Sequence, residues 1–242
     1  MAAGPYNGFA ANLLIYLIIW GYQYHMADIM SFIPRLLRGT AITIELTVVA
    51  VIFGLILGLL LALGRLSKNA IVNKLSWLYI WFFRGTPLLM QLFFIYYAFP
   101  LFFDPPLRGL NATMAAFIGF SLNSGAYLAE IIRAAIQSID KGQMEAAKAL
   151  GMTYGQAMRR VIVPQSYRRL IPPVGNEFIM LIKDTSLVSI IAMQDLMRVT
   201  HEIESQQAKA LVYVPAAIIY LILTTVFTVV FEKLEKKYSV YE

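Results

Sequence analysis

Residues 145–151 read Glu-Ala-Ala-Lys-Ala-Leu-Gly and lie, with the residues up to Pro164, between two long apolar runs. The first six residues of this stretch form helices readily. Gly151 can adopt the left-handed backbone conformation that ends a helix. Thr153 can cap a second helix over about 154–161, which Pro164 would then end. The stretch therefore predicts a helix–glycine–helix loop that lies flat at a membrane surface.

The composition indicates a helical protein that crosses a membrane several times. Of the 242 residues, 59% are apolar and 14% are charged, and the mean hydropathy is +0.66. A soluble domain usually carries about 25% charged residues. The net charge of +6 does not indicate nucleic-acid binding, because the basic residues lie in short loops instead of on one soluble face. The absence of cysteine excludes disulfides and thiolate chemistry.

Several apolar segments are each long enough to cross a bilayer, which takes about 20 helical residues. They cover 40–63, 75–103, 113–136, 170–193 and 211–231. We therefore expect an all-α polytopic membrane protein with about five transmembrane helices. The expected parts of the chain are an N-terminal segment (1–39), a transmembrane domain (40–235) with a cytoplasmic loop (138–166), and a tail (236–242).

The N-terminal segment predicts an amphipathic helix ahead of the first span. This helix would begin near Ala27, carry Arg35 and Arg38 along the outer surface, and then turn into the membrane. Residues 1–25 contain a short apolar run but carry no functional prediction.

The distribution of lysine and arginine between the spans predicts the orientation, because cytoplasmic loops are richer in these residues. One side would receive Arg65, Lys68, Lys74, Lys141, Lys148, Arg159, Arg160, Arg168, Arg169, Lys233, Lys236 and Lys237. The other side would receive Arg35, Arg38, Arg108, Arg198 and Lys209. We therefore expect the loop at 138–166 and the C-terminus in the cytoplasm, and the N-terminus outside.

One family of membrane proteins has motifs that resemble three separated stretches of this chain, at 84–87, 125–151 and 183–187. The Glu-Ala-Ala-x-x-x-Gly run at 145–151, with Ile-Val-Pro at 162–164, is similar to the EAA loop of bacterial ABC importer permeases. Arg-Gly-Thr-Pro at 84–87, the run at 125–133 and Lys-Asp-Thr-Ser-Leu at 183–187 resemble its polar amino-acid branch, the histidine, arginine and glutamine permeases. The resemblance covers nearly the whole chain and implies a type I ABC importer permease fold in a bacterial cytoplasmic membrane.

The resemblance also implies partners. Cytoplasmic ATPase subunits would dock on the loop, a second permease subunit, identical or related, would complete the pore, and an extracytoplasmic binding protein would deliver the substrate. The residues that would form the coupling surface are Glu145, Ala146, Ala147, Gly151 and Pro164. The sequence has no Gly-x-x-x-x-Gly-Lys-Ser/Thr phosphate loop, so we expect a non-catalytic subunit without a cofactor. His25 and His201 are isolated and predict no metal site.

Polar residues within the spans are candidates for substrate binding, because a charged side chain at membrane depth costs about 2.5–3.5 kcal/mol. The candidates are Arg84, Asn123, Glu130, Asp184, Thr185 and Ser186. An unwound segment at Asp184 would place this carboxylate against an ammonium group. Structural alternatives remain open. Arg84 could mark a kink and reach the headgroups, and Glu130 could pair with Arg133 along one helix face. Lys183 and Asp184 could form a charge network that locks a dimer.

Acidic residues near membrane depth slightly outnumber basic ones, which favours a cationic amino acid such as arginine, lysine or histidine. The acidic residues are Glu45, Glu130, Glu177 and Asp184, and the basic ones are Arg84, Arg133 and Lys183. Glutamine or glutamate is the alternative substrate. A stand-alone channel or secondary carrier and an intramembrane enzyme are the alternative classes. The loop argues against the carrier, and the lack of His and Cys within the spans argues against the enzyme.

Overall fold

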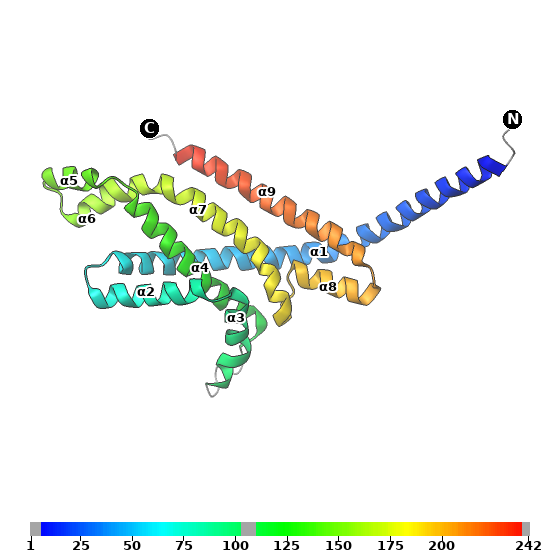
Figure 1. Cartoon of the computed structure of the whole chain (residues 1–242), viewed down its shortest axis with the longest axis horizontal. Coiled ribbons are helices and arrows are strands. Elements are labelled where there is room, and N and C mark those ends of the chain that lie inside the picture. The colour runs from blue at the N-terminus through cyan, green and yellow to red at the C-terminus, as the bar shows by residue number, and fades with distance from the viewer. Residues whose placement is uncertain (1–5, 103–109, 239–242) are drawn as a thin grey trace.

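The computed structural model describes residues 6–102 and 110–238, with side chains from Asp28 onward, and these residues form helices and no strand. The longer helices are α1 (Tyr6–Leu66), α2 (Ala70–Gly85), α4 (Ala112–Gln137), α7 (Val163–Asp184), α8 (Leu196–Gln207) and α9 (Tyr213–Tyr238) (Figure 1). The shorter elements are α3 (Leu88–Phe93), α5 (Lys141–Ala149), α6 (Tyr154–Ala157), the π-helices η1 (Phe94–Ala98) and η4 (Met158–Ile162), and the 3-10 helices η2 (Phe99–Leu101), η5 (Thr185–Ile191) and η6 (Ala210–Val212). The all-α fold class is confirmed.

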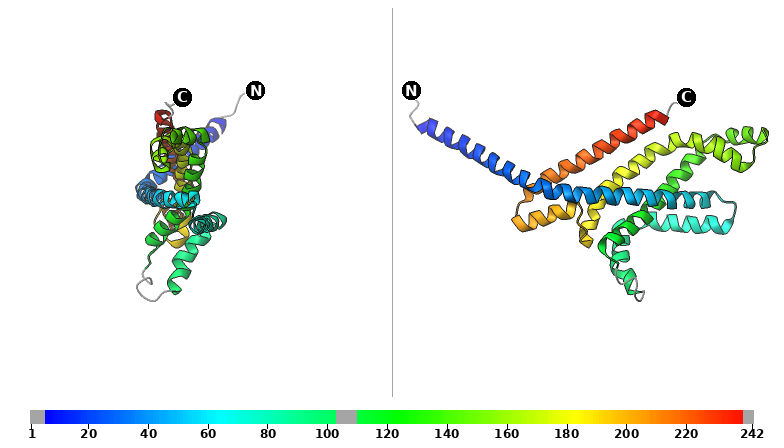
Figure 2. Two further views of the ribbon diagram at one scale, coloured as in Figure 1. Left: turned by 90° about the vertical axis from the view of Figure 1, so that its left-hand side faces the viewer. Right: turned by 180° about the vertical axis from the view of Figure 1, so that it is seen from behind.

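The N-terminal segment and the first span form one continuous helix. α1 is continuous from Tyr6 to Leu66 and contains Pro34. A proline inside a helix removes one hydrogen bond and bends the helix, but it need not end it. α1 changes direction in its N-terminal part (Figure 2). The helix therefore continues through the expected boundary at residues 39 and 40, and the position of its N-terminal part along the membrane surface stays a prediction.

Among the described residues, three helical segments are long and apolar enough to cross a bilayer, namely Asp28–Leu66 of α1, Ala112–Gln137 and Ala210–Tyr238. Ala70–Gly85 and Leu88–Leu101 together would form a fourth span, but they meet at an angle of 103°. α7 is too polar to qualify, because it carries charged residues along its length. It packs against α4 and α9 instead. The five expected spans thus correspond to three long helices, one bent pair and one polar helix.

Small residues allow α1 and α4 to approach closely. A Cβ atom on Gly54 would lie 2.9 Å from the Ser124 hydroxyl oxygen. A Cβ atom on Gly58 would lie 3.0 Å from the backbone nitrogen of Ala129. Such close contacts need residues without side chains, as in the small-xxx-small motif of membrane helices. Ser124, Gly125 and Ala126 form a small-residue patch on α4, and α1 packs against this patch.

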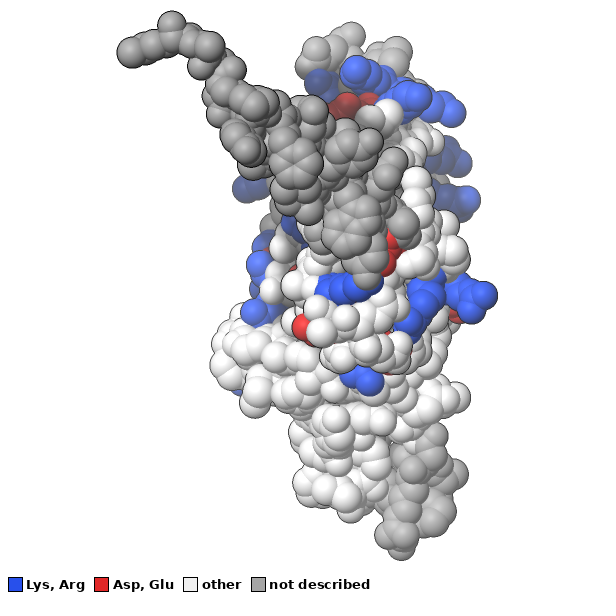
Figure 3. All heavy atoms as spheres, turned by 90° about the vertical axis from the view of Figure 1, so that its right-hand side faces the viewer, with Lys and Arg blue, Asp and Glu red and all other residues white. Residues whose placement is uncertain are grey.

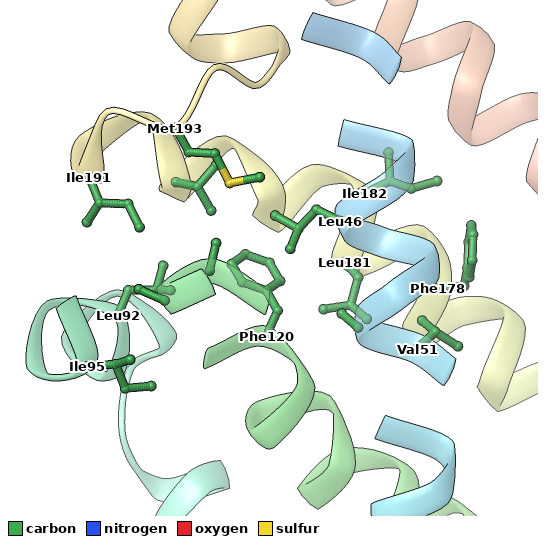
Figure 4. Packing of buried hydrophobic residues seen from close by; sticks show 14 residues of the cluster. Leu46, Val51, Leu92, Ile95, Phe120, Phe178, Leu181, Ile182, Ile191 and Met193 are labelled. Atoms are coloured by element: carbon green, nitrogen blue, oxygen red, sulfur yellow. The ribbon is translucent and has the colours of Figure 1, made fainter. Parts of the chain in front are cut away.

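A buried apolar cluster fixes the elements that carry the polar residues. Its side chains come from α1, α3, α4, α7 and η5 and point toward one another (Figure 4). Its largest members include Leu46, Leu92, Phe120, Ile182 and Ile191. This cluster holds α3 and the C-terminal end of α7 against α1 and α4. The bend after α2 and the end of α7 are thereby brought to one level of the bundle.

The two ends of the bundle differ in structure. α5, α6, the α1–α2 turn and the C-terminal end of α9 lie at one end, and α8 and the start of α9 lie at the other (Figures 1 and 2). At the α8 end, Lys209 Nζ lies 2.6 Å from Asp28 Oδ1 and ties this end of the chain to α1. Seen from this side, the charged residues lie on the upper and middle parts of the surface, and the described surface below them is uncharged (Figure 3).

Candidate substrate path and coupling surface

α5 ends in a hydrogen-bond pattern that depends on Gly151. The backbone N–H of Met152 donates to the Ala147 carbonyl at 3.1 Å. The N–H of Gly151 donates to the Lys148 carbonyl at 2.9 Å. This pair of bonds is the Schellman motif, in which the residue after the helix adopts a left-handed conformation. Gly151 has a φ of +81°, so the predicted helix end is confirmed.

Thr153 begins the next helix with a capping box. Its hydroxyl accepts from the Gln156 N–H at 3.3 Å, and its own N–H donates to Gln156 Oε1 at 2.9 Å. The predicted end of this helix at Pro164 is wrong, because the chain stays helical through η4 and into α7. The π-turns of η4 change the hydrogen-bond register just before Pro164. Pro164 then lies in the first turn of α7, where a missing N–H is tolerated.

The coupling candidates lie mostly on the outer surface of this loop. Glu145, Ala146 and Gly151 are exposed, whereas Ala147 is buried, where α5 packs against α6 and η4. Leu150 is apolar and yet 81% exposed. α5 and α6 project from the end of the bundle, so this leucine is accessible from outside it.

Side-chain amides hold the bend between α2 and α3. Gln91 Nε2 donates to the carbonyls of Phe83, at 2.9 Å, and Thr86, at 3.0 Å. Asn123 Nδ2 donates to Gln91 Oε1 at 3.0 Å and to the Phe83 carbonyl at 3.2 Å. These bonds satisfy carbonyls that a helix interrupted by Pro87 leaves without partners. Asn123 therefore supports the bend, in addition to any contact with a substrate.

A cavity of about 300 Å³ opens beside this bend. Arg84 of α2 and Asn123 of α4 line one part of it, and Glu177 and Asp184 of α7 line another. Glu177 is buried and Asp184 is half-buried. One guanidinium group and two carboxyl groups thus share a polar cavity inside the helix bundle.

Three of the candidate residues, Glu130, Thr185 and Ser186, do not line this cavity. Thr185 is fully buried, and its hydroxyl donates to the Ile182 carbonyl at 2.7 Å. Ser186 lies in η5, and its carbonyl accepts from the Ser189 hydroxyl at 2.7 Å. The α-helix does end at Asp184, as the expected break requires. A 3-10 helix follows α7 instead of an open loop. The hydroxyl of Thr185 and the carbonyl of Ser186 therefore form hydrogen bonds with nearby residues of the same segment.

Glu130 lies on the loop side of this cavity. Its Oε2 atom lies 2.6 Å from Arg133 Nη2, which confirms the pairing along one helix face. Glu130 instead lines two other cavities, of about 500 and 420 Å³, which Arg84 and Tyr127 line as well. The Arg84 guanidinium carbon lies 5.3 Å from the centroid of the Tyr127 ring.

Glu177 and Tyr127 are missing from the candidates predicted by sequence. Glu177 and Asp184 are two helical turns apart, which places them on one face of α7. Tyr127 follows Asn123 by one turn and shares its face of α4. Helical spacing from the predicted residues was therefore the signal that could have found both.

Residues 54–240 match the family described as the binding-protein-dependent transport system inner membrane component. Since the match covers most of the chain, the protein belongs to this family, the membrane permease subunits of ABC transporters, which pair with ATPase and substrate-binding subunits. It is a multi-pass inner-membrane permease of the amino-acid ABC type.

Two relatives and one solved structure illustrate the similarity. The L-cystine transport system permease protein TcyB of Bacillus subtilis is 44% identical over 220 residues, which cover 87% of this chain and 89% of TcyB. The glutamine transport system permease protein GlnP of Escherichia coli K12 is 38% identical over 219 residues, which cover 90% of this chain and 99% of GlnP. Among solved structures, the crystal structure of an amino acid ABC transporter with histidines matches with a TM-score of 0.82. Its chain is 37% identical in sequence, and the match covers 87% of this chain and 97% of that one.

Proposed function

We propose that this permease moves a polar, preferentially cationic amino acid into the cytoplasm by alternating access. The observation that supports this most directly is the cavity at the helix bend, where Arg84 shares the lining with Glu177 and Asp184. Charged groups inside a membrane bundle are expensive and mark substrate pathways. A cavity with both signs of charge suits a zwitterion.

The balance of charge in the cavity supports the cationic preference. Arg84 can receive the α-carboxylate of an amino acid, because a guanidinium group binds a carboxylate through two parallel hydrogen bonds. One carboxyl group of Glu177 and Asp184 can receive the α-ammonium group, and the other is then free for a positive side chain. Arginine, lysine and histidine carry such a group. Glutamine is the alternative, because its amide could bond to the same carboxyl group without a charge.

The energy would come from ATPase subunits that dock on the loop at 138–166. Glu145, Ala146, Ala147, Gly151 and Pro164 are the proposed contact residues, together with the exposed Leu150. A second permease subunit would close the pore, and an extracytoplasmic binding protein would load it. Closure of the ATPases would pull on the loop and change which side of the membrane the cavity faces.

Uptake of radiolabelled arginine by the complete complex in proteoliposomes tests this proposal. We expect ATP-dependent uptake that unlabelled arginine competes more strongly than glutamine does. Asp184→Asn and Glu177→Gln should raise KM for arginine, by about 10-fold or more for loss of a charged hydrogen bond, and change KM for glutamine less. Dominant glutamine uptake would overturn the cationic preference and leave the importer intact.

Two loop variants test the coupling role. Glu145→Lys and Gly151→Pro should insert into the membrane normally and abolish uptake, and Lys141→Gln on the same loop serves as the control that retains it. Uptake by the purified chain without ATP would instead show a stand-alone carrier.

A further inference from the structure

Three cavities share the same two residues. Arg84 and Tyr127 line the cavity at the bend and both cavities on the side of the coupling loop. The guanidinium group lies over the Tyr127 ring at 5.3 Å, within the range of a cation–π contact. The stacked pair therefore stands between the cavity at the bend and the cavities beyond it.

The two helices that line these cavities mark out one continuous route. Along α4, Asn123 lines the cavity at the bend, Tyr127 lines all three, and Ser138 lines the cavity nearest the loop. Along α7, Asp184 lines the cavity at the bend, and Arg169 lines the cavity nearest the loop. The route therefore runs from the helix bend to the start of the loop at 138–166, and the pair lies across it.

Arg84 has carboxylates on both sides of its position. Glu177 and Asp184 lie on the side of the bend, and Glu130 lies on the side of the loop. An arginine side chain is long and can bond to a carboxylate in either direction. We propose that Arg84, stacked on Tyr127, is the inner gate of the substrate path. This inference rests on the proposed function, because a gate needs a substrate that passes it.

The gate has a closed and an open position. In the closed position, the guanidinium group covers the Tyr127 ring and separates the cavity at the bend from the cytoplasmic side. In the open position, it turns toward Glu130 and joins the cavities.

Concentrative uptake in proteoliposomes with the complete complex tests the gate, using radiolabelled arginine and, separately, glutamine. Tyr127→Ala removes the platform under Arg84. We expect the accumulation ratio to fall roughly 10-fold while ATP hydrolysis continues, because substrate leaks back through the open gate. Tyr127→Phe keeps the ring and loses the hydroxyl, and it should accumulate substrate as the wild type does.

A second variant leaves Arg84 in place and keeps the packing on α4. Tyr127→Leu has an apolar side chain of similar size but offers Arg84 no ring, so it should leak as Tyr127→Ala does while ATP hydrolysis continues. Wild-type accumulation by Tyr127→Ala or by Tyr127→Leu would overturn the gate and leave the importer standing. Failure of the wild-type complex to take up either amino acid would instead overturn the proposed function.

Discussion

Gly151 and Gly155 lie four residues apart in the coupling loop but differ in the backbone conformation that they adopt. No atom lies within 4 Å of a Cβ added at either position, so space does not distinguish them. Gly151 has a φ of +81°, whereas Gly155 lies within α6. Gly151→Ala should cost about 1–2 kcal/mol, because an L side chain strains the left-handed conformation. Gly155→Ala should be neutral or stabilise by up to about 1 kcal/mol.

Thermal unfolding of the detergent-solubilised protein measures this difference, and ATP-driven uptake measures its consequence. We expect Gly151→Ala to lower both and Gly155→Ala to lower neither. Equal stability of the two variants would show that the conformation at 151 is not what holds the loop.

Asp195 caps α8 and lies outside the membrane-spanning helices. Its carboxylate accepts from the backbone N–H groups of Met197 and Arg198, at 3.0 and 2.9 Å. Burial raises the pKa of this carboxyl from 3.8 to about 6. The folded protein therefore holds the proton more tightly than the unfolded chain does. The stability that this proton provides is present below about pH 4 and is lost as the pH rises through 6.

Melting temperatures measured between pH 4 and pH 7 check the sign. Asp195→Asn keeps an oxygen that can cap the helix but cannot titrate. Between pH 4 and pH 7 its free energy of unfolding should therefore fall by about 2 kcal/mol less than that of the wild type. Asp195→Ala should lose the cap and be less stable than Asp195→Asn, by about 1 kcal/mol. A wild type that gains stability from pH 4 to pH 7 relative to Asp195→Asn would contradict the prediction.

The neighbouring sequence predicts the structural role of some residues and not of others. The roles of Gly151 and Thr153 in ending and starting helices could be predicted, because each depends on backbone bonds to near neighbours. The effect of Pro164 could not, because it depends on the π-turns of η4. The hydroxyl of Thr185 also bonds locally, to a carbonyl three residues earlier. The position of a polar residue within a span does not by itself tell whether its side chain bonds to its own helix or faces a cavity.

At the scale of elements, the bend between α2 and α3 depends on one glutamine. Gln91 Nε2 donates to Phe83 and Thr86, and Gln91 Oε1 accepts from Asn123. Gln91→Leu has a similar volume and removes all of these bonds. Because the Thr86 carbonyl then loses this donor and the Asn123 amide loses its acceptor, we expect a loss of roughly 1–3 kcal/mol in stability. The cavity beside the bend should also lose its affinity for substrate.

Thermal unfolding and KM for uptake together test this prediction. Met90→Leu is the matched control, since Met90 is adjacent in sequence and 61% exposed. It should behave as the wild type does. If Gln91→Leu unfolds at the wild-type temperature with an unchanged KM, the amides do not hold the bend.

The sequence predicts that an interruption occurs at Pro87, because proline and glycine stand together within an apolar run. The angle of 103° could not be predicted, since it is set by contacts between distant segments. Gln91 and Asn123 are 32 residues apart and meet only in the folded chain. The cavity that joins Arg84 to Glu177 arises in the same way.

At the scale of the whole molecule, composition predicts the all-α membrane fold, and the three motifs predict the family. α7 is the element for which composition is least informative. Its charges make it too polar for a lipid-facing helix, and it is instead packed against α4 and α9. Such a helix can be identified as part of the bundle only from the helices that pack against it, and these are known only from the folded structure.

The orientation of the molecule in the membrane is the last prediction. Most basic residues between the spans lie at the end that carries α5 and α6, so this end should face the cytoplasm. Because the chain has no cysteine, Lys148→Cys and Ser205→Cys each introduce a single thiol at an exposed position, one at each end. A membrane-impermeant maleimide added to intact cells should label Ser205→Cys and leave Lys148→Cys unlabelled. Disruption of the membrane should expose both thiols. Labelling of Lys148→Cys in intact cells would place the coupling loop outside, away from ATP, and the proposed energy source would then be wrong.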